Sequence, residues 1–226
     1  MWCEDSKSGY QFWRAIFGVL FPDFTVETKD SNSRLRKAAE KIGNDGNHYY
    51  ILMDTVLDNP DVVRETTRLN KCVAGKDNVH VIRLHSFEFA LLSFELLEQW
   101  VFSEENKLRD NRQELLRARA LLIKHLTSEV SAADLQAFKK AFDAYETRNT
   151  EQIAAKLLFE ITRNTGFETD KSELGDCFVN NCCEWNGLQS NNPCGLNVHR
   201  ISSDEKAKLL VEHSVLKAAF EGVSLL

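Results

Sequence analysis

The feature that most constrains the fold is an alternation of strand-like and helix-like segments over roughly the first hundred residues. The run YYILM at 49–53 is the most strand-like, and it is too apolar for a strand with one solvated face. Such a run is typical of a central parallel strand that helices cover on both sides. Strand-like segments also occupy 1–3, 23–28 and 78–84, and a helix-like segment follows each. These strand–helix units predict a parallel sheet with right-handed crossovers.

The helix-like segments carry their own boundary signals. They span residues 10–20, 32–43, 60–71 and 87–102. Asn32 or Ser33 is the expected N-cap of the second segment, and Gly43 is its expected end. Pro60 fits the first turn of the third. The fourth segment is long and apolar enough to predict one buried helix.

After about residue 103 the strand-like segments stop. Amphipathic helical patterns occupy 104–126, 131–146, 150–165 and 203–222. Residues 166–200 contain four cysteines and few periodic signals. We therefore expect an α/β domain at 1–103 and a mainly helical region at 104–226, with an irregular segment at 166–200.

Composition limits the class of protein. With 226 residues, 43% of them hydrophobic, the chain can form one large domain or a domain with an appendage. No stretch is apolar for long enough to span a bilayer, and the start MWCEDSKSG does not resemble a signal peptide, so we expect a cytoplasmic protein with no membrane partner. Its six cysteines then favour thiols or metal ligands over disulfides. A net charge of −6 argues against nonspecific coating of nucleic acid, although a local basic face remains compatible with it.

Acidic residues follow the strand-like segments. Glu4 comes directly after the first, Asp54 and Asp58 come after the third, and Glu88 comes after the fourth, with three residues between it and Leu84. Because ligands of open parallel sheets bind at the carboxyl ends of the strands, these acids are expected at one edge. Carboxylates that meet there favour a divalent cation such as Mg²⁺. The alternative is that each acid caps a helix or lies in a solvated loop.

These residues resemble a known family. Glu4 followed by DSKSGYQFW, the Asp54 and Asp58 pair, and HSFEFALLSF together look like a Toprim domain, most closely that of the overcoming-lysogenization-defect (OLD) nucleases and their small relatives in phage-defence systems. The resemblance covers about residues 1–103. It implies a Toprim/Rossmann-like α/β fold and a metal-dependent nuclease that cleaves DNA or RNA phosphodiester bonds.

The resemblance also implies roles for the acids. Glu4, Asp54 and Asp58 would hold Mg²⁺ or Mn²⁺, with Glu88 completing the catalytic set, and Glu4 is alternatively a general base. Three basic side chains are candidates for phosphate contacts, with an ordinary surface role as the alternative: Lys7, Arg83 and His85.

The sequence departs from the family pattern at two points. Three residues separate Asp54 from Asp58 where the family has one, and Asp5 follows Glu4 where the family has glycine or a small polar residue. The alternative function is therefore a non-catalytic Toprim-like module that binds a partner protein such as an associated ATPase. A homo-oligomer is also compatible with the sequence.

Basic residues of the later part suggest a second role. Arg109, Arg112 and Arg119 approach one face of a predicted helix, near Lys107, Arg117 and Lys124, and such a stripe can follow a phosphate backbone. A solvated face paired with Glu105, Asp110 and Glu114 is the alternative. The segment at 32–43 has a similar cluster, open to the same two interpretations: Arg34, Arg36, Lys37 and Lys41.

The cysteine-rich segment offers a candidate zinc site. Its potential ligands are Cys177, Cys182, Cys194 and His199, with Cys183 beside the second. The spacing does not form two C-x2-C pairs, so buried free thiols packing with Phe178 and Trp185 are the favoured alternative. The chain has no G-x-G-x-x-G, P-loop, G-x-S-x-G or H-E-x-x-H motif, which leaves the carboxylates as the candidate for hydrolytic chemistry.

Overall fold

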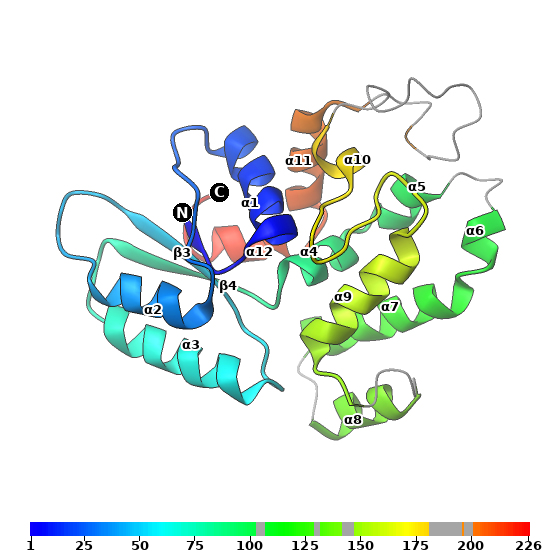
Figure 1. Ribbon diagram of the computed structural model, residues 1–226, viewed down its shortest axis with the longest axis horizontal. Coiled ribbons are helices and arrows are strands. Elements are labelled where there is room, and N and C mark those ends of the chain that lie inside the picture. Colours follow the sequence, from blue (N-terminus) through cyan, green and yellow to red (C-terminus); the bar gives the residue numbers. More distant parts are fainter. Residues whose placement is uncertain (103–106, 129–131, 142–146, 181–195, 197–200) are drawn as a thin grey trace.

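The computed structural model describes residues 1–102, 107–128, 132–141, 147–180, 196 and 201–226 (Figure 1). Its strands form one four-stranded, fully parallel sheet in the order β2-β1-β3-β4. The strands are β1 (Trp2–Cys3), β2 (Glu27–Thr28), β3 (Tyr49–Asp54) and β4 (Val79–Leu84). The prediction of an α/β fold with a parallel sheet is confirmed.

The strand order places a change of direction in the middle of the sheet. The chain leaves β1 to form β2 on one side, and it then returns to form β3 on the other side of β1. From β3 it continues outward to β4, which pairs with β3 along its whole length. In open parallel sheets the crevice between two strands whose connections diverge in this way is the usual ligand site.

Helices follow each strand. In the first part of the chain they are α1 (Lys7–Leu20), α2 (Asn32–Glu40), α3 (Pro60–Val73), α4 (Phe87–Ser93) and α5 (Leu97–Val101). The expected single helix at 87–102 is wrong, because the chain breaks at Phe94 between α4 and α5. The N-cap of α2 is Ser31, whose side chain accepts a hydrogen bond from the Arg34 N–H, and not Asn32 or Ser33. The helix ends at Glu40, before Gly43.

The described helices of the later part follow their patterns only in part. They are α6 (Lys107–Asp110), α7 (Gln113–Thr127), α8 (Ala132–Ala141), α9 (Thr150–Thr162), α10 (Asp176–Val179), α11 (Ser203–Glu212) and α12 (Leu216–Glu221). The patterns at 104–126 and 203–222 each form two helices instead of one. In the part of the chain that the structure describes, no helix combines the length and apolar character needed to cross a membrane.

Both faces of the sheet are covered, as the apolar character of the third strand predicts. Ile51 and Met53 face a small core beneath α2 and α3, which Leu35 and Leu69 complete. Leu52 faces the opposite way, into a larger core. In Figure 1, α2 and α3 lie on one side of the sheet, and α1 and α12 lie on the other.

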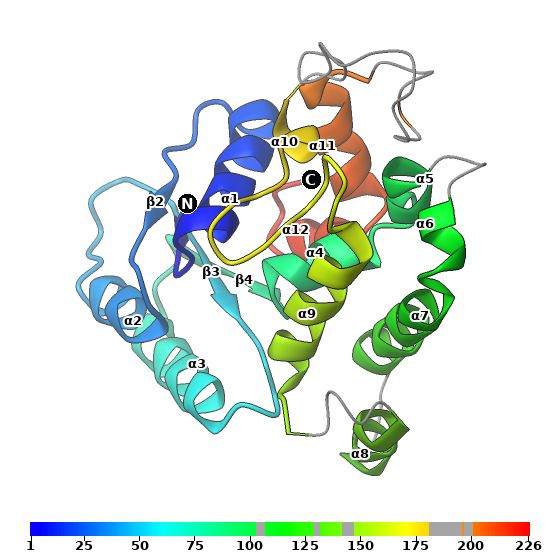
Figure 2. The same ribbon diagram turned by 45° about the vertical axis from the view of Figure 1, so that its right-hand side comes forward.

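The larger core joins early and late parts of the chain. It runs from Met1 to Phe220 and includes residues of α1, α4, α7, α9, α11 and α12. The Phe220 ring packs edge-on against the Phe17 ring of α1, with 5.6 Å between centroids. Helix α9 packs against both α4 and α7, an arrangement visible in Figure 2. Helices from before and after residue 103 therefore share one hydrophobic core.

Candidate active site

Acidic side chains gather at the crevice between β1 and β3. Glu4 and Asp5 follow β1 directly, and Asp54 is the last residue of β3. Because the two strands are adjacent and parallel, their carboxyl ends open at the same edge. Two acids from helices join them: Glu88 near the start of α4 and Glu151 near the start of α9. We call these five residues the carboxyl cluster.

Asp5 is held by its contacts with α1. The Trp13 Nε1–H donates a hydrogen bond to Asp5 Oδ2 at 2.7 Å, and Trp13 itself is fully buried. The Asp5 side chain lies directly over Gly9, where a Cβ atom would come within 2.7 Å of the Asp5 Cγ. Glycine is therefore required at position 9 for the carboxyl group to occupy this place.

Asp54 is the most deeply buried acid of the cluster, with 4% of its surface exposed. Among the described residues, its Oδ1 has no hydrogen-bond partner. Burial raises the Asp54 pKa well above its ordinary value, and the neighbouring charges of Asp5, Glu4, Glu88 and Glu151 raise it further. A buried oxygen without a partner is unusual, because desolvation of a polar group is normally compensated by hydrogen bonds.

Glu88 enters from α4. Ser86 caps this helix by accepting a hydrogen bond from the Phe89 N–H at 3.2 Å, which fixes the first turn that carries Glu88. Burial raises the Glu88 pKa to about 8, with smaller contributions from Asp5 and Glu151. At neutral pH without a bound cation, this carboxyl group therefore holds a proton.

Glu151 enters from α9 and was not expected from the sequence. Its helix begins with a capping box in which Asn149 and Gln152 bond reciprocally. Burial raises the Glu151 pKa, while Lys171 lowers it. The capping box could have placed the helix start, but it could not have shown that a residue so distant in sequence reaches the ends of β1 and β3.

Glu4 and Asp5 also have raised pKa values. Burial raises the Glu4 pKa to about 7, the charges of Asp5 and Glu151 add to this effect, and the Asp54 and Asn32 side chains oppose it. Burial also raises the Asp5 pKa to about 6, although the Trp13 hydrogen bond opposes the increase. The cluster therefore concentrates carboxyl groups whose full ionisation is unfavourable without a counter-charge.

The cluster is not a preformed metal cage. Within the described ranges, no three His, Cys, Asp or Glu side chains converge in a way that could hold a metal ion. The cluster nevertheless offers only oxygen donors, the type that hard cations such as Mg²⁺ prefer. The unpartnered Asp54 Oδ1 is the donor most directly left open for a ligand.

Asp58 lies outside the cluster. One carboxylate oxygen accepts a bond from Lys139 Nζ at 2.6 Å, and the carboxylate also accepts bonds from the N–H and hydroxyl of Thr150. Its pKa is lowered by these partners, which outweigh the effect of burial. The expected role of Asp58 as a metal ligand is therefore corrected: it caps α9, the helix that carries Glu151.

The three basic candidates near strand ends have different surroundings. Lys7 is exposed at the start of α1 and is near enough to Asp170 to help lower the pKa of that carboxyl group. Arg83 is exposed on β4 and borders a separate, mainly apolar cavity beside α7 and α12. His85 borders the same cavity, and its Nε2 lies 2.8 Å from the Thr150 hydroxyl oxygen.

The predicted arginine stripe is not continuous. Arg112 is buried and donates to the backbone oxygens of Ile161 and Arg163 at the end of α9. Arg119 is also buried and donates to the backbone oxygens of Leu92 and Phe94 where α4 ends. These two guanidinium groups satisfy helix carbonyls, so they are not available to a phosphate backbone. Only Arg109 remains exposed, in an ion pair with Glu98.

The remaining predictions concern α2 and the cysteines. Arg34 forms an ion pair with Asp30, and Arg36 forms ion pairs with Glu65 and Glu40. Lys37 and Lys41 are exposed. Cys177 is buried. The other candidate zinc ligands, Cys182, Cys194 and His199, lie outside the described residues, as do Cys183 and Trp185.

No protein-family model, curated protein or solved structure matches the chain, so the interpretation of this site depends on its own geometry.

Proposed function

We propose that this protein is a Toprim-like nuclease, a divalent-metal-dependent hydrolase of nucleic-acid phosphodiester bonds. The observation that carries the proposal is the burial of Glu4, Asp5, Asp54, Glu88 and Glu151 together at the crevice between β1 and β3. Purely structural carboxylates are usually paired with cations or exposed to water, as Asp58 is paired with Lys139. The cluster instead gathers acids that repel one another.

The chemistry of the cluster fits a hard divalent cation. Asp54 would be the central ligand, because its Oδ1 is buried without a partner among the described residues. Asp5, Glu4 and Glu88, in that order, exert the largest charge effects on the Asp54 pKa and are the additional donors. A bound Mg²⁺ or Mn²⁺ supplies a Lewis acid and a water molecule of lowered pKa at the site. Asp58, which is engaged with α9, is excluded from this set.

The protein's own side chains would perform the remaining tasks. Trp13 and Gly9 fix Asp5 in place, so that Asp5 can orient the ligands beside it. The Glu88 carboxyl, with its pKa near 8, can hold a proton at neutral pH and release it when positive charge enters the cluster. Lys171, which acts on the charge of Glu151, borders a cleft that begins at Glu88 and is suited to hold an anionic group.

The alternative, a partner-binding module without catalysis, predicts a large apolar patch on the later helices. In the described part of the chain, the exposed large hydrophobic side chains are Leu57, Val63 and Leu226. Only the last of these follows residue 103, so no such patch supports the alternative there.

The decisive experiment measures cleavage of supercoiled plasmid and of structured RNA by the purified protein with Mg²⁺ or Mn²⁺. Asp54→Asn and Glu4→Gln are the test variants, because they remove charge and preserve shape. Asp23→Asn is the matched control, since Asp23 is exposed in the loop that precedes β2, at the opposite edge of the sheet. We expect metal-dependent cleavage that both test variants lose and the control retains.

Two results would contradict the proposal. The first is cleavage that survives in Asp54→Asn, which would indicate a contaminating nuclease or another site. The second is the absence of cleavage by the wild-type protein together with an unchanged melting temperature when either metal is added, because a bound ligand stabilises the folded state.

A further inference from the structure

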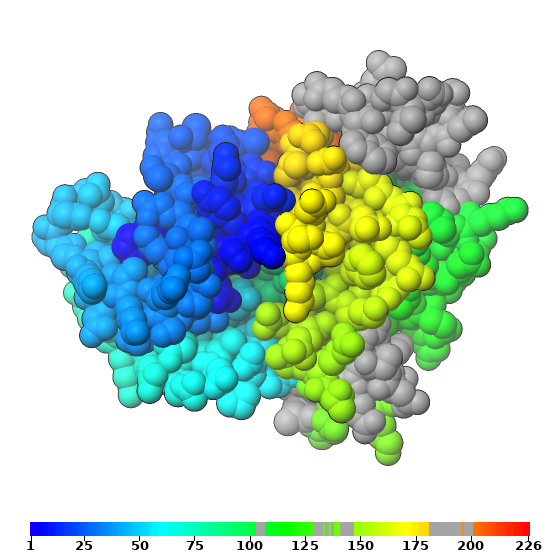
Figure 3. Space-filling model, viewed as in Figure 1, coloured from blue at the N-terminus to red at the C-terminus, as the bar shows by residue number. Residues whose placement is uncertain are grey.

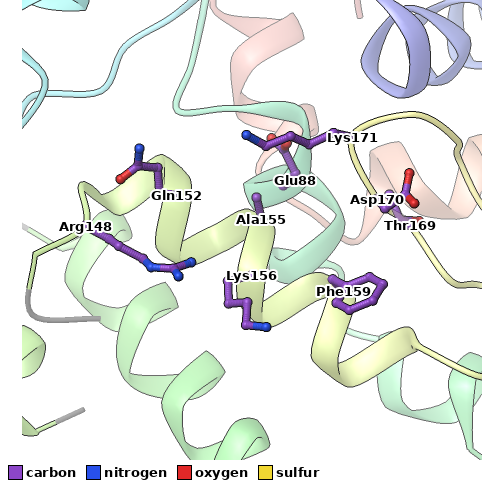
Figure 4. A pocket seen from close by; sticks show the side chains of 9 residues that line it. All are labelled: Glu88, Arg148, Gln152, Ala155, Lys156, Phe159, Thr169, Asp170 and Lys171. Carbon is purple, nitrogen blue, oxygen red and sulfur yellow. The ribbon is translucent and has the colours of Figure 1, made fainter. Parts of the chain in front are cut away.

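A cleft of about 560 Å³ leads away from the carboxyl cluster along α9. Glu88 is one of the residues that line it, so the cleft and the cluster share one acid. One wall is the face of α9 that carries Gln152, Ala155 and Phe159, and the opposite wall is the segment Thr169–Lys171 (Figure 4). In Figure 3 this later segment, in yellow, lies beside the dark blue N-terminal residues on one face of the molecule.

The cleft is lined by more free positive than negative charge. Arg148, Lys156 and Lys171 all border it. Lys156 is paired with Glu160 on the same helix, whereas Arg148 and Lys171 form no ion pair within the described residues. Figure 4 shows Arg148 and Lys171 on opposite sides of the cleft. Two unpaired cations that face one cleft favour an anionic ligand.

The acids that border the cleft offset this charge only in part, because the ionised Asp170 is one negative charge beside two unpaired cations. The Asp170 carboxylate accepts bonds from the N–H and hydroxyl of Ser172 and from the Glu173 N–H, which closes a tight turn. Its role in that turn explains its presence without requiring a positively charged ligand. Glu88 belongs to the carboxyl cluster, where a cation would neutralise it.

The cleft also has an aromatic surface. Phe159 is half-buried, and its ring lies along the wall with Lys156 Nζ 5.8 Å from the ring centroid. Nucleic-acid bases stack on such rings, and stacking tolerates any base because each has a π face. Its volume of about 560 Å³ lies in the size range of small-ligand sites and is too small to hold both strands of a duplex together.

We infer that this α9 cleft binds a single-stranded nucleic acid, with phosphates at Arg148 and Lys171 and a base against Phe159, and leads that strand to the carboxyl cluster. This inference rests on the proposed function and adds the class of substrate. An acidic protein segment is the competing occupant, but a peptide carboxylate would not require an aromatic wall between the two cations.

The test is binding of fluorescein-labelled oligothymidylate and oligouridylate, measured by fluorescence anisotropy in EDTA so that no cleavage occurs. The same strands annealed to their complements provide the duplex forms, and polyglutamate is the acidic competitor. The two single strands distinguish DNA from RNA. The variants are Phe159→Ala, Arg148→Gln and Lys171→Gln, with the exposed Lys217→Gln on α12 as the matched control.

We expect single strands to bind at least about tenfold more tightly than duplexes, and Phe159→Ala to weaken single-strand binding by about tenfold, the size of one stacking contact. Arg148→Gln and Lys171→Gln should each lower the slope of log affinity against log salt by about 0.7, since each removes one phosphate contact. Lys217→Gln should bind like the wild type.

Equal affinity for duplex, wild-type affinity in all three cleft variants, or stronger binding of polyglutamate than of either single strand would overturn the inference. Its failure is distinguishable from failure of the proposed function. If the protein cleaves nucleic acid with metal but the cleft variants bind single strands as the wild type does, the cleft inference is rejected and the proposed nuclease function stands. If the cleft variants weaken single-strand binding but the wild type cleaves nothing at any metal concentration, the proposed nuclease function is rejected and the cleft inference stands.

Discussion

Asp58, in the loop after β3, caps the N-terminus of α9 by accepting hydrogen bonds from both the N–H and the hydroxyl of Thr150, 92 residues later in the chain. The N–H distances are 3.1 and 3.0 Å to the two carboxylate oxygens. The contact fixes the start of the helix that carries Glu151, one residue beyond the cap contact. Asp58 is therefore not a member of the carboxyl cluster, but it positions the helix that supplies Glu151 to it.

We expect Asp58→Ala to lower the free energy of unfolding by about 2 kcal/mol, because it removes a helix cap and leaves the Lys139 ammonium group largely buried without its partner. Urea denaturation measures the change. Asp61→Ala is the control, since Asp61 pairs with Arg64 at an exposed position and should lose less than about 1 kcal/mol. Equal losses in the two variants would show that the Thr150 contact has no special role.

Gly9→Ala tests the fit between α1 and Asp5. A Cβ at position 9 overlaps the Asp5 side chain, so we expect the variant to displace that carboxyl group, to destabilise the protein by about 1–3 kcal/mol and to reduce cleavage. Gly18→Ala is the matched control on the same helix. No atom of the described residues lies within 4 Å of its added Cβ, and we expect a gain of about 0.5–1 kcal/mol. If both glycine variants melt alike, the close approach at Gly9 does not constrain the site.

Glu88 should make the metal-free protein less stable as pH rises. Its folded pKa of about 8 lies above its ordinary value of 4.5, so the folded state binds the extra proton between these values. The contribution to stability is complete below about pH 4.5 and is lost as pH rises through about 8. We expect the melting temperature of Glu88→Gln in EDTA to be less sensitive to pH over this window. The control Glu221→Gln, at an exposed position of α12, should follow the wild type; a Glu88→Gln profile parallel to the wild type would exclude this linkage.

Burial of His85 should make the protein less stable as pH falls. Burial lowers its pKa from 6.5 to about 4, so the unfolded state binds the extra proton between these values. The stability that His85 contributes is present above about pH 6.5 and is lost as pH falls towards 4, by on the order of 3 kcal/mol. We expect His85→Gln to lose less stability than the wild type over this range in acid unfolding. The exposed His48→Gln is the control, and a larger acid effect at His48 than at His85 would contradict the assignment.

Mg²⁺ should stabilise the wild-type protein more at pH 8 than at pH 6. The Glu4 and Glu88 pKa values of about 7 and about 8 mean that a cation must displace protons at the lower pH. Thermal melts with and without Mg²⁺ at each pH measure this difference, and a hundredfold excess over the dissociation constant adds about 2.7 kcal/mol. Asp54→Asn should abolish the effect at both values. A metal-induced shift that does not change with pH would place the binding site away from the cluster.

The sequence predicted the parts of the fold that depend on local patterns. The apolar run ending at Asp54 predicted a central strand, and Ile51 and Leu52 indeed face opposite cores. The break at Phe94 was not predictable, because no proline or glycine interrupts the apolar run there. The chain turns where Arg119, from a distant helix, bonds the carbonyl of Phe94.

The site was predictable only where strand ends define it. Glu4, Asp54 and Glu88 follow strands, so the rule for parallel sheets located them. Glu151 is on a helix whose position depends on the Asp58 cap, and no spacing in the sequence encodes that contact. The predicted arginine stripe was misleading for a different reason. Helical periodicity cannot distinguish an exposed cation from one that donates to buried carbonyl groups, as Arg112 does.

The packing of Phe220 against Phe17 has a consequence for biosynthesis. The aromatic face of α1 is made within the first twenty residues, yet the ring that covers it is translated only near the end of the chain. On the ribosome this face therefore lacks its Phe220 cover while strands β2 to β4 and helices α2 to α11 are being synthesised. Chains released before α12 should expose it, and they are the species that chaperones and proteases would encounter first.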